Sequence, residues 1–217
     1  MNNNQSILGN RLYNHYPDGF GSYFIIGRRN IGKSTYALIA AYCAFIKLGY
    51  KHNEAWEKAL HSICFSIPEV IDYLEYAIDQ NEKEFILIWD DVRVHASGHQ
   101  YFINIELVKQ LSGLLDTIKV VLNNIILTCP SSKGLLGVFT TFDDYSIQIQ
   151  QSKLGGNYRL AKGYQWNTTP SGQKRIYKKF REDYYCRLPN WVYALYIKRR
   201  IQITKDTIYA IKELTKK

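Results

Sequence analysis

Short, continuously apolar runs recur along the first two thirds of the chain, and each of them ends at a polar or glycine-containing stretch. The clearest runs are Tyr23–Ile26, Phe85–Trp89 and Asn124–Cys129. Unbroken apolar runs of this length are typical of strands that are buried on both faces of a parallel sheet. Residues 145–150 (YSIQIQ) alternate and predict a further strand, and residues 61–66 could form a brief one.

Helical spacing separates these runs. A helix is predicted over residues 34–48 and ends at Gly49, and another has Pro68 near its first turn and continues to about residue 80. Asn53 can cap a short helix, residues 103–118 have helical spacing, and residues 11–21 indicate an irregular lead-in. Strands that alternate with helices predict an α/β fold, with a mostly parallel sheet covered by helices on both faces.

The pattern changes after residue 156. Residues 158–167 and 174–186 are two extended runs rich in Tyr, Lys and Arg, and the intervening TPSG predicts a hairpin. Pro189 opens a helix, and a final short helix could begin at Thr204. We therefore expect a core over residues 1–156, with a basic β-hairpin and C-terminal helices over residues 157–217 packed on it.

The charge follows the same division. The 217-residue chain has a net charge of +9, but residues 1–152 hold 12 Lys/Arg and 15 Asp/Glu, whereas residues 153–217 hold 16 and 4. Such asymmetry favours a surface that faces a polyanion, although a solvated basic surface has the same composition. Basic side chains among aromatic ones suit DNA. The residues expected to contact its backbone are Lys174, Arg175, Lys178, Lys179, Arg181, Lys198, Arg199 and Arg200.

The four cysteines do not form a metal or disulfide pattern. No two of Cys43, Cys64, Cys129 and Cys186 have C-x-x-C spacing, so free thiols in a reducing compartment are expected. No signal-peptide pattern and no apolar stretch long enough for a membrane span is found. These features predict a soluble cytoplasmic protein. His95 and His99 lack further ligands at metal-binding spacing and are expected in a polar loop.

One segment carries a specific chemical pattern. Residues 27–34 read GRRNIGKS and satisfy G-x-x-x-x-G-K-[ST], between an apolar run and an apolar helix, as a phosphate-binding loop requires. The glycines allow backbone amides to face phosphate oxygens, and the helix start adds free N–H groups. Lys33 is expected to reach the β- and γ-phosphates, and Ser34 to ligate Mg²⁺. The predicted ATP site comprises Gly27, Arg28, Arg29, Asn30, Ile31, Gly32, Lys33, Ser34 and Thr35.

A pair of acids supplies what a triphosphate site also needs. The run FILIW ends in Asp90 and Asp91. Asp90 is placed to hold Mg²⁺ through water, and Asp91 to orient or deprotonate the attacking water. Two acids after a strand are common by themselves, but together with the phosphate loop they point to ATP hydrolysis.

The phosphate loop and the acid-ended strand resemble the additional-strand, catalytic-glutamate division of P-loop ATPases, the RecA-like branch. Asp91 stands where that family usually has Glu. NIILTCPSS matches the inserted strand that carries a polar sensor, so the resemblance implies that Thr128 or Ser131 lies near the γ-phosphate. The wider layout, from ICFSIPEV to NIILTCPSSKGLL, is similar to small ATPases of archaeal viruses and plasmids akin to the FtsK–HerA group. That resemblance implies a homo-oligomeric motor for DNA translocation or genome packaging, in the host cytoplasm if virus-encoded.

Several alternatives remain open. A small-molecule or nucleotide kinase shares the phosphate loop, and a nucleotide switch or a replication initiator fits the basic C-terminal region. The acid pair favours water as the acceptor over a kinase substrate. In an oligomer, a basic residue could reach a neighbour's nucleotide; the candidates are Arg28, Arg29, Arg93, Lys109 and Lys119.

Overall fold

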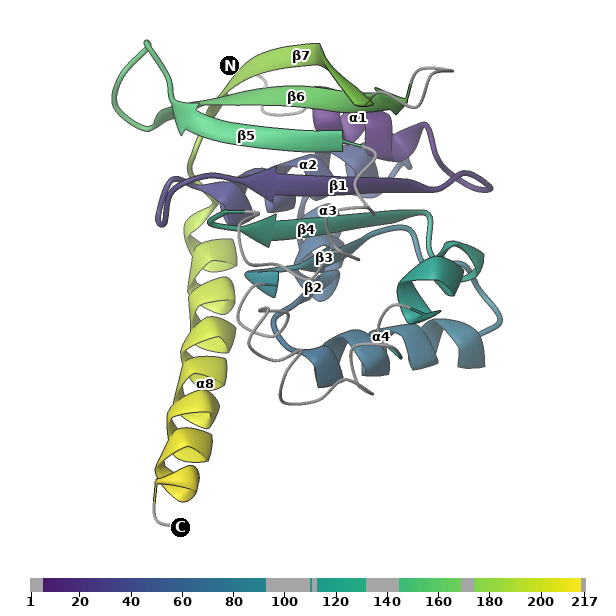
Figure 1. Ribbon diagram of the computed structural model, residues 1–217, viewed down its shortest axis with the longest axis vertical. Helices are drawn as coiled ribbons and strands as arrows, with labels where there is room; N and C mark the ends of the chain where they lie inside the picture. Colours follow the sequence, from purple (N-terminus) through teal and green to yellow (C-terminus); the bar gives the residue numbers. More distant parts are fainter. Residues whose placement is uncertain (1–5, 93–109, 111–112, 132–144, 169–173, 216–217) are drawn as a thin grey trace. The chain divides into compact units, whose positions relative to one another are not determined.

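Five parallel strands form the centre of the protein in a computed structural model that describes residues 6–92, 110, 113–131, 145–168 and 174–215 (Figure 1). β1 (Gly21–Ile26) is the strand that precedes the phosphate loop, and we call it the loop strand. It lies between β4 (Asn124–Cys129) and β5 (Tyr145–Gln151). Next to β4 come β3 (Leu87–Trp89) and then β2 (Ile63–Cys64). The mostly parallel sheet that the apolar runs predicted is therefore confirmed.

Two antiparallel strands complete the sheet. β6 (Tyr158–Thr168) pairs with β5, and β7 (Lys174–Tyr185) pairs with β6, which gives the order β2-β3-β4-β1-β5-β6-β7. The basic hairpin thus extends the sheet. Its register shifts between Gly163 and Tyr164, where a Cβ on Gly163 would clash with the Phe180 ring.

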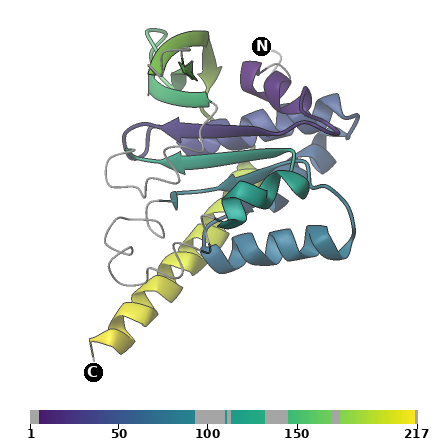
Figure 2. The same cartoon turned by 45° about the vertical axis from the view of Figure 1, so that its right-hand side comes forward.

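Helices cover the two faces of the sheet, as Figure 2 shows. One face carries α1 (Ile7–Tyr13), α2 (Lys33–Lys47) and α3 (His52–His61), which pack on one another in that order. The other face carries α4 (Ile67–Asp79), a helical turn over residues 113–117 and the 3₁₀ helix Ile118–Val120. Alternate residues of the strands, such as Phe24, Trp89 and Leu127, form a core with α4.

Three details differ from the sequence expectations. The first three residues of the expected lead-in, 11–13, belong to α1. Ser6 caps the N–H of Gly9, and Gly9 lets α1 approach α2 closely: a Cβ there would lie 2.8 Å from the Cβ of Cys43. The cap of α3 is Lys51 rather than Asn53, with no side-chain hydrogen bond. The C-terminal segment is one helix, α8 (Asn190–Leu214), since no Gly or Pro interrupts it.

The chain divides into two compact units, Met1–Arg187 and Leu188–Lys217. The first unit holds the whole seven-stranded sheet, and the second holds α8. Most of the helix expected over residues 103–118 lies outside the described residues. Within the described part, no helix has both the length and the apolar character needed to cross a membrane.

Candidate nucleotide site

The loop between β1 and α2 begins as soon as β1 ends. Gly27 packs tightly, because a Cβ on it would lie 2.9 Å from the carbonyl oxygen of Ile149. Asn30 and Gly32 both have positive φ angles, 58° and 100°, and Gly32 is the N-cap of α2. This left-handed geometry suits Gly and Asn and turns the backbone amides ahead of the helix. The first N–H groups of α2 therefore face the end of the sheet, where an anion can bind.

Lys33 is the first residue of α2 and reaches back over the loop. Its Nζ donates a hydrogen bond to the carbonyl oxygen of Arg28, at 3.0 Å. The side chains of Arg28, Arg29 and Asn30 are exposed, whereas Lys33, Ser34 and Thr35 are half-buried. The loop thus presents an ammonium group at the mouth of a backbone cradle, an arrangement that suits a polyphosphate.

Asp90 lies at the carboxyl end of β3 and is 2% exposed. Its Oδ1 accepts hydrogen bonds from Ser34 Oγ and from Thr128 Oγ1, both at 2.6 Å. The three residues come from three separate segments of the chain, and the sheet brings them together. A hydroxyl oxygen beside a carboxylate oxygen is a donor set that Mg²⁺ accepts, so Ser34 and Asp90 fit a magnesium ion held with water.

Asp91 follows directly and has a different conformation. Its φ angle is 54°, and its backbone N–H donates to Thr128 Oγ1 at 3.0 Å. Thr128 thus accepts from Asp91 and donates to Asp90, which joins the two acids through β4. Of the two residues proposed as sensor, Thr128 makes these contacts. For Ser131 the structure gives a backbone contact, its carbonyl oxygen accepting from Cys129 Sγ at 2.8 Å.

Strand β7 contacts the loop and α2, which the sequence analysis did not predict. The Tyr184 hydroxyl donates to the carbonyl oxygen of Gly32 at 3.0 Å, and the Tyr184 and Tyr36 rings lie 4.7 Å apart. Cys186, which follows β7, packs on Gly32. The alternation of Glu182 and Tyr184 indicates that they share a face of β7, but the sequence pattern does not say which element that face meets.

Burial raises the pKa values of two side chains near the loop, Tyr36 and Cys186. Burial, followed by the nearby Glu182 carboxylate, raises the pKa of Tyr36 well above its usual value. The Tyr36 hydroxyl donates to Glu182, which also accepts from the backbone N–H of Ile7 at 2.7 Å. Burial also raises the pKa of the Cys186 thiol. Tyr36 and Cys186 are therefore neutral near pH 7, and Glu182 ties α1, α2 and β7 together.

Some of the candidate residues lie elsewhere. Lys119 is exposed on the 3₁₀ helix, and Arg93, Lys109, His95 and His99 are outside the described residues. Across the described ranges, no three His, Cys, Asp or Glu residues cluster in a way that could hold a metal ion. The four cysteines are free thiols, as expected.

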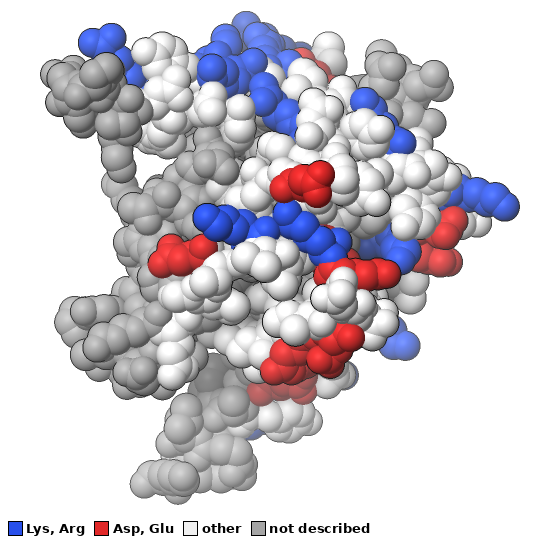
Figure 3. All heavy atoms as spheres, turned by 90° about the vertical axis from the view of Figure 1, so that its right-hand side faces the viewer, with Lys and Arg blue, Asp and Glu red and all other residues white. Residues whose placement is uncertain are grey.

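Basic residues gather on the hairpin. Arg175, Lys178, Lys179 and Arg181 are all exposed on β7. Figure 3 shows Lys and Arg side chains grouped at the top of the molecule, at the height of β6 and β7 in Figure 1, whereas acidic and basic side chains mix below. On α8, Lys198 and Arg200 are exposed and Arg199 is half-buried.

The chain is 27% identical over 201 residues to the uncharacterized protein B-251 of Sulfolobus spindle-shape virus 1, a match that spans 89% of this chain and 79% of that protein. No family model matches the chain.

Among solved structures, the N-terminal domain of zonular occludens toxin from Neisseria meningitidis has a TM-score of 0.47 and 15% identity, over 81% of this chain and 98% of that chain. The flagellar accessory protein FlaH from Methanocaldococcus jannaschii has a TM-score of 0.40 and 16% identity, over 78% and 95%. A KaiC-like protein from Pyrococcus horikoshii has a TM-score of 0.37 and 14% identity, over 74% and 89%.

The strand order itself is decisive. The acid-bearing β3 is not adjacent to the loop strand β1, because β4 lies between them, as the matched NIILTC segment predicted. A phosphate loop after β1, an inserted β4 and an acid-ended β3 give this chain the fold of the RecA-like P-loop ATPases.

Proposed function

We propose that the protein binds Mg-ATP at the loop and hydrolyses it. The observation that carries this proposal is the contact of Asp90 with both Ser34 and Thr128 at 2.6 Å. It brings a carboxylate, the loop hydroxyl and a polar residue of the inserted strand to one point beside the phosphate cradle. A solvated strand end would not assemble this set.

Each residue has a distinct role in this proposal. The loop amides and Lys33 bind the β- and γ-phosphates, and Ser34 and Asp90 hold Mg²⁺, which neutralises charge on the phosphate oxygens. Asp91 positions the attacking water and accepts its proton. Thr128 holds Asp90 through its hydroxyl and is the better candidate for the sensor, since it contacts both acids.

We further propose that ATP hydrolysis drives movement of DNA, as in translocation or genome packaging, by a homo-oligomer. The exposed cations of β7 support the DNA surface, because phosphate contacts from Lys and Arg dominate affinity for nucleic acids. The similarity to a protein of Sulfolobus spindle-shape virus 1 agrees with a viral role, which would place the protein in the host cytoplasm.

Release of inorganic phosphate from ATP tests the enzymatic part. Lys33→Ala is expected to lower the rate by about 100-fold or more, because a positive charge on the transferred phosphate is lost. Lys51→Ala is the matched control, since Lys51 is exposed and lies outside the loop. Wild-type turnover by Lys33→Ala would refute the site. A phosphorylated small molecule in place of free phosphate would instead support a kinase.

The rate of phosphate release with and without DNA tests the proposal that the protein acts on DNA. DNA is expected to stimulate hydrolysis, with an effect that fades as salt is raised. The triple variant Lys178→Ala, Lys179→Ala, Arg181→Ala should lose the stimulation and keep the rate measured without DNA. A triple variant that responds to DNA as the wild type does would exclude this surface.

A further inference from the structure

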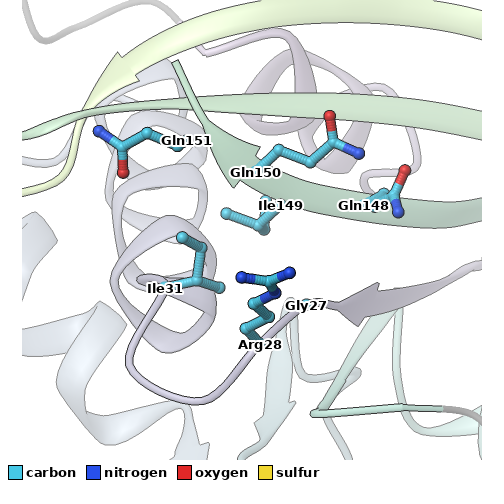
Figure 4. A pocket seen from close by; sticks show the side chains of 7 residues that line it. All are labelled: Gly27, Arg28, Ile31, Gln148, Ile149, Gln150 and Gln151. Atoms are coloured by element: carbon cyan, nitrogen blue, oxygen red, sulfur yellow. The ribbon is translucent and has the colours of Figure 1, made fainter. Parts of the chain in front are cut away.

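A pocket of about 430 Å³ lies beside the phosphate loop (Figure 4). Gly27, Arg28 and Ile31 of the loop line it, together with residues 148–151 of β5. The register of β1 and β5 pairs Ile26 with Gln148, so β5 continues beyond the point where β1 ends. The pocket is therefore at the carboxyl edge of the sheet, where ligands of open α/β sheets bind.

The pocket and the contact between Asp90 and Thr128 lie on opposite sides of the loop strand β1. Asp90 and Thr128 belong to β3 and β4, on one side of β1, and β5 is on the other. A triphosphate whose last phosphate lies near Asp90 must lead its sugar and base away from Asp90. On the β5 side it meets this pocket, whose volume is within the range of small-ligand sites.

We propose that this pocket holds the nucleotide base and that Gln148 and Gln150 select adenine. This inference rests on the proposed ATP site and adds the residues that choose the base. A glutamine amide offers a donor and an acceptor side by side, and adenine presents the complementary pair at N6 and N7. Guanine presents two acceptors at the same positions, which a single amide cannot satisfy.

The two glutamines differ in their present contacts. Gln150 Oε1 accepts from Lys162 Nζ at 2.9 Å, which fixes the amide and leaves its NH₂ group to donate. For Gln148 the structure gives no side-chain hydrogen bond within the described residues, so both ends of its amide can serve a ligand. Gln151 is engaged elsewhere, since its Nε2 donates to the carbonyl oxygens of Gly156 and Tyr158.

The remaining lining residues suit the flat faces of a base. In Figure 4, Ile31 lies to the left of the Arg28 side chain and Ile149 above it, and the amides of Gln148 and Gln150 lie to the upper right. An isoleucine side chain packs on an aromatic face, and a guanidinium plane stacks on one. Among the described residues that line the pocket, none is acidic. The N1–H and N2–H₂ donors of guanine would therefore lack a carboxylate partner.

Equilibrium binding of ATP, GTP and inorganic triphosphate tests the proposal. The wild type is expected to prefer ATP over GTP by roughly tenfold or more, and Gln148→Ala to lose about tenfold in ATP affinity. Inorganic triphosphate should bind both proteins equally, because it has no base. Gln148→Glu replaces the amide donor by an acceptor, so it should weaken ATP, because a carboxylate oxygen then faces the N7 acceptor of adenine.

Gln165→Ala is the matched control, since Gln165 pairs with Tyr145 at the other end of β5. Thermal unfolding of each variant excludes a loss of fold. Equal affinity of the wild type for ATP and GTP, or a Gln148→Ala variant that loses triphosphate as strongly as ATP, would overturn the base assignment while leaving the ATP site intact. A wild type that binds neither nucleotide, or a Lys33→Ala variant that binds ATP normally, would refute the proposed function itself.

Discussion

Asp90 and Asp91 are neighbours in the chain, but their surroundings differ. Asp90 is buried and accepts two hydroxyl hydrogen bonds, so its carboxylate is fixed. Asp91 is half-buried, with its backbone in the left-handed region at φ 54°. Among non-glycine residues, Asp and Asn tolerate this region best, and it recurs at functional sites. The backbone at Asp91 thus has a conformation that most other residue types would strain.

Replacement of Asp91 by Gly separates its backbone role from its side-chain role. Asp91→Gly relieves the left-handed strain but adds entropy to the unfolded chain, so the free energy of unfolding should change by less than about 0.5 kcal/mol. ATP hydrolysis should fall by about 100-fold or more with ATP binding retained, because the water loses its base. Asp91→Ala should be about 1 kcal/mol less stable than Asp91→Gly. Denaturant unfolding and phosphate release measure both effects, and a fully active Asp91→Gly would remove Asp91 from the mechanism.

At the scale of elements, the sequence predicts best what is local. Strands β1, β3 and β4 were found because burial on both faces demands apolar runs, and β5 because its residues alternate. The phosphate loop was found because its residues are consecutive. Helix α1 was missed because it is only seven residues long and is held by Gly9 on α2 and by Glu182 on β7. Tyr184 was missed for the same reason: its contact with Gly32 spans 152 residues.

The contact between β7 and the loop yields a prediction. Tyr184→Phe removes the hydroxyl from the Gly32 carbonyl, which retains the N–H of Tyr36 at 2.9 Å. We expect a loss of about 1 kcal/mol in unfolding free energy and a several-fold loss in ATP affinity, because the loop is held less firmly. Tyr185→Phe is the control, since Tyr185 lies on the same strand with its side chain exposed. Equal effects of the two variants would argue against a link between β7 and the loop.

Across the whole chain, the residues proposed to bind ATP are separate in sequence from most of the basic residues. The basic excess begins between β5 and β6, so the proposed ATP site lies in the acidic part, and the hairpin and α8 hold most of the basic residues. The hairpin nevertheless belongs to the same sheet as the loop, and one face of β7 touches α2 while Lys178 and Arg181 are exposed. Two strands, β5 and β6, lie between β7 and β1, but Tyr184 of β7 contacts the loop directly, so a polyanion bound on β7 would lie on a strand that touches the proposed nucleotide site.

Four buried Tyr and Cys side chains have raised pKa values, and they predict how the stability of the first unit, Met1–Arg187, depends on pH. Burial raises the pKa of Cys43 from 9.0 to about 12, and burial also raises the pKa of Tyr36, Tyr73 and Tyr184 above their usual 10.0. A raised pKa means that the folded state binds the proton more tightly. The stability that these four groups contribute is therefore constant below about pH 9 and falls above it, as the unfolded chain releases these protons first.

The melting temperature is accordingly expected to be flat between about pH 7 and about pH 8.5 and to fall steeply above about pH 9. Each group contributes about 1.4 kcal/mol per pH unit while only its unfolded form is ionised. Cys43→Ala lowers stability at every pH through lost packing, but it removes one titrating thiol, so its decline between pH 9 and about pH 12 should be shallower than that of the wild type. Differential scanning calorimetry across this range measures both slopes. Parallel curves would show that the Cys43 thiol does not control the alkaline transition, because lost packing shifts the curve without changing its slope.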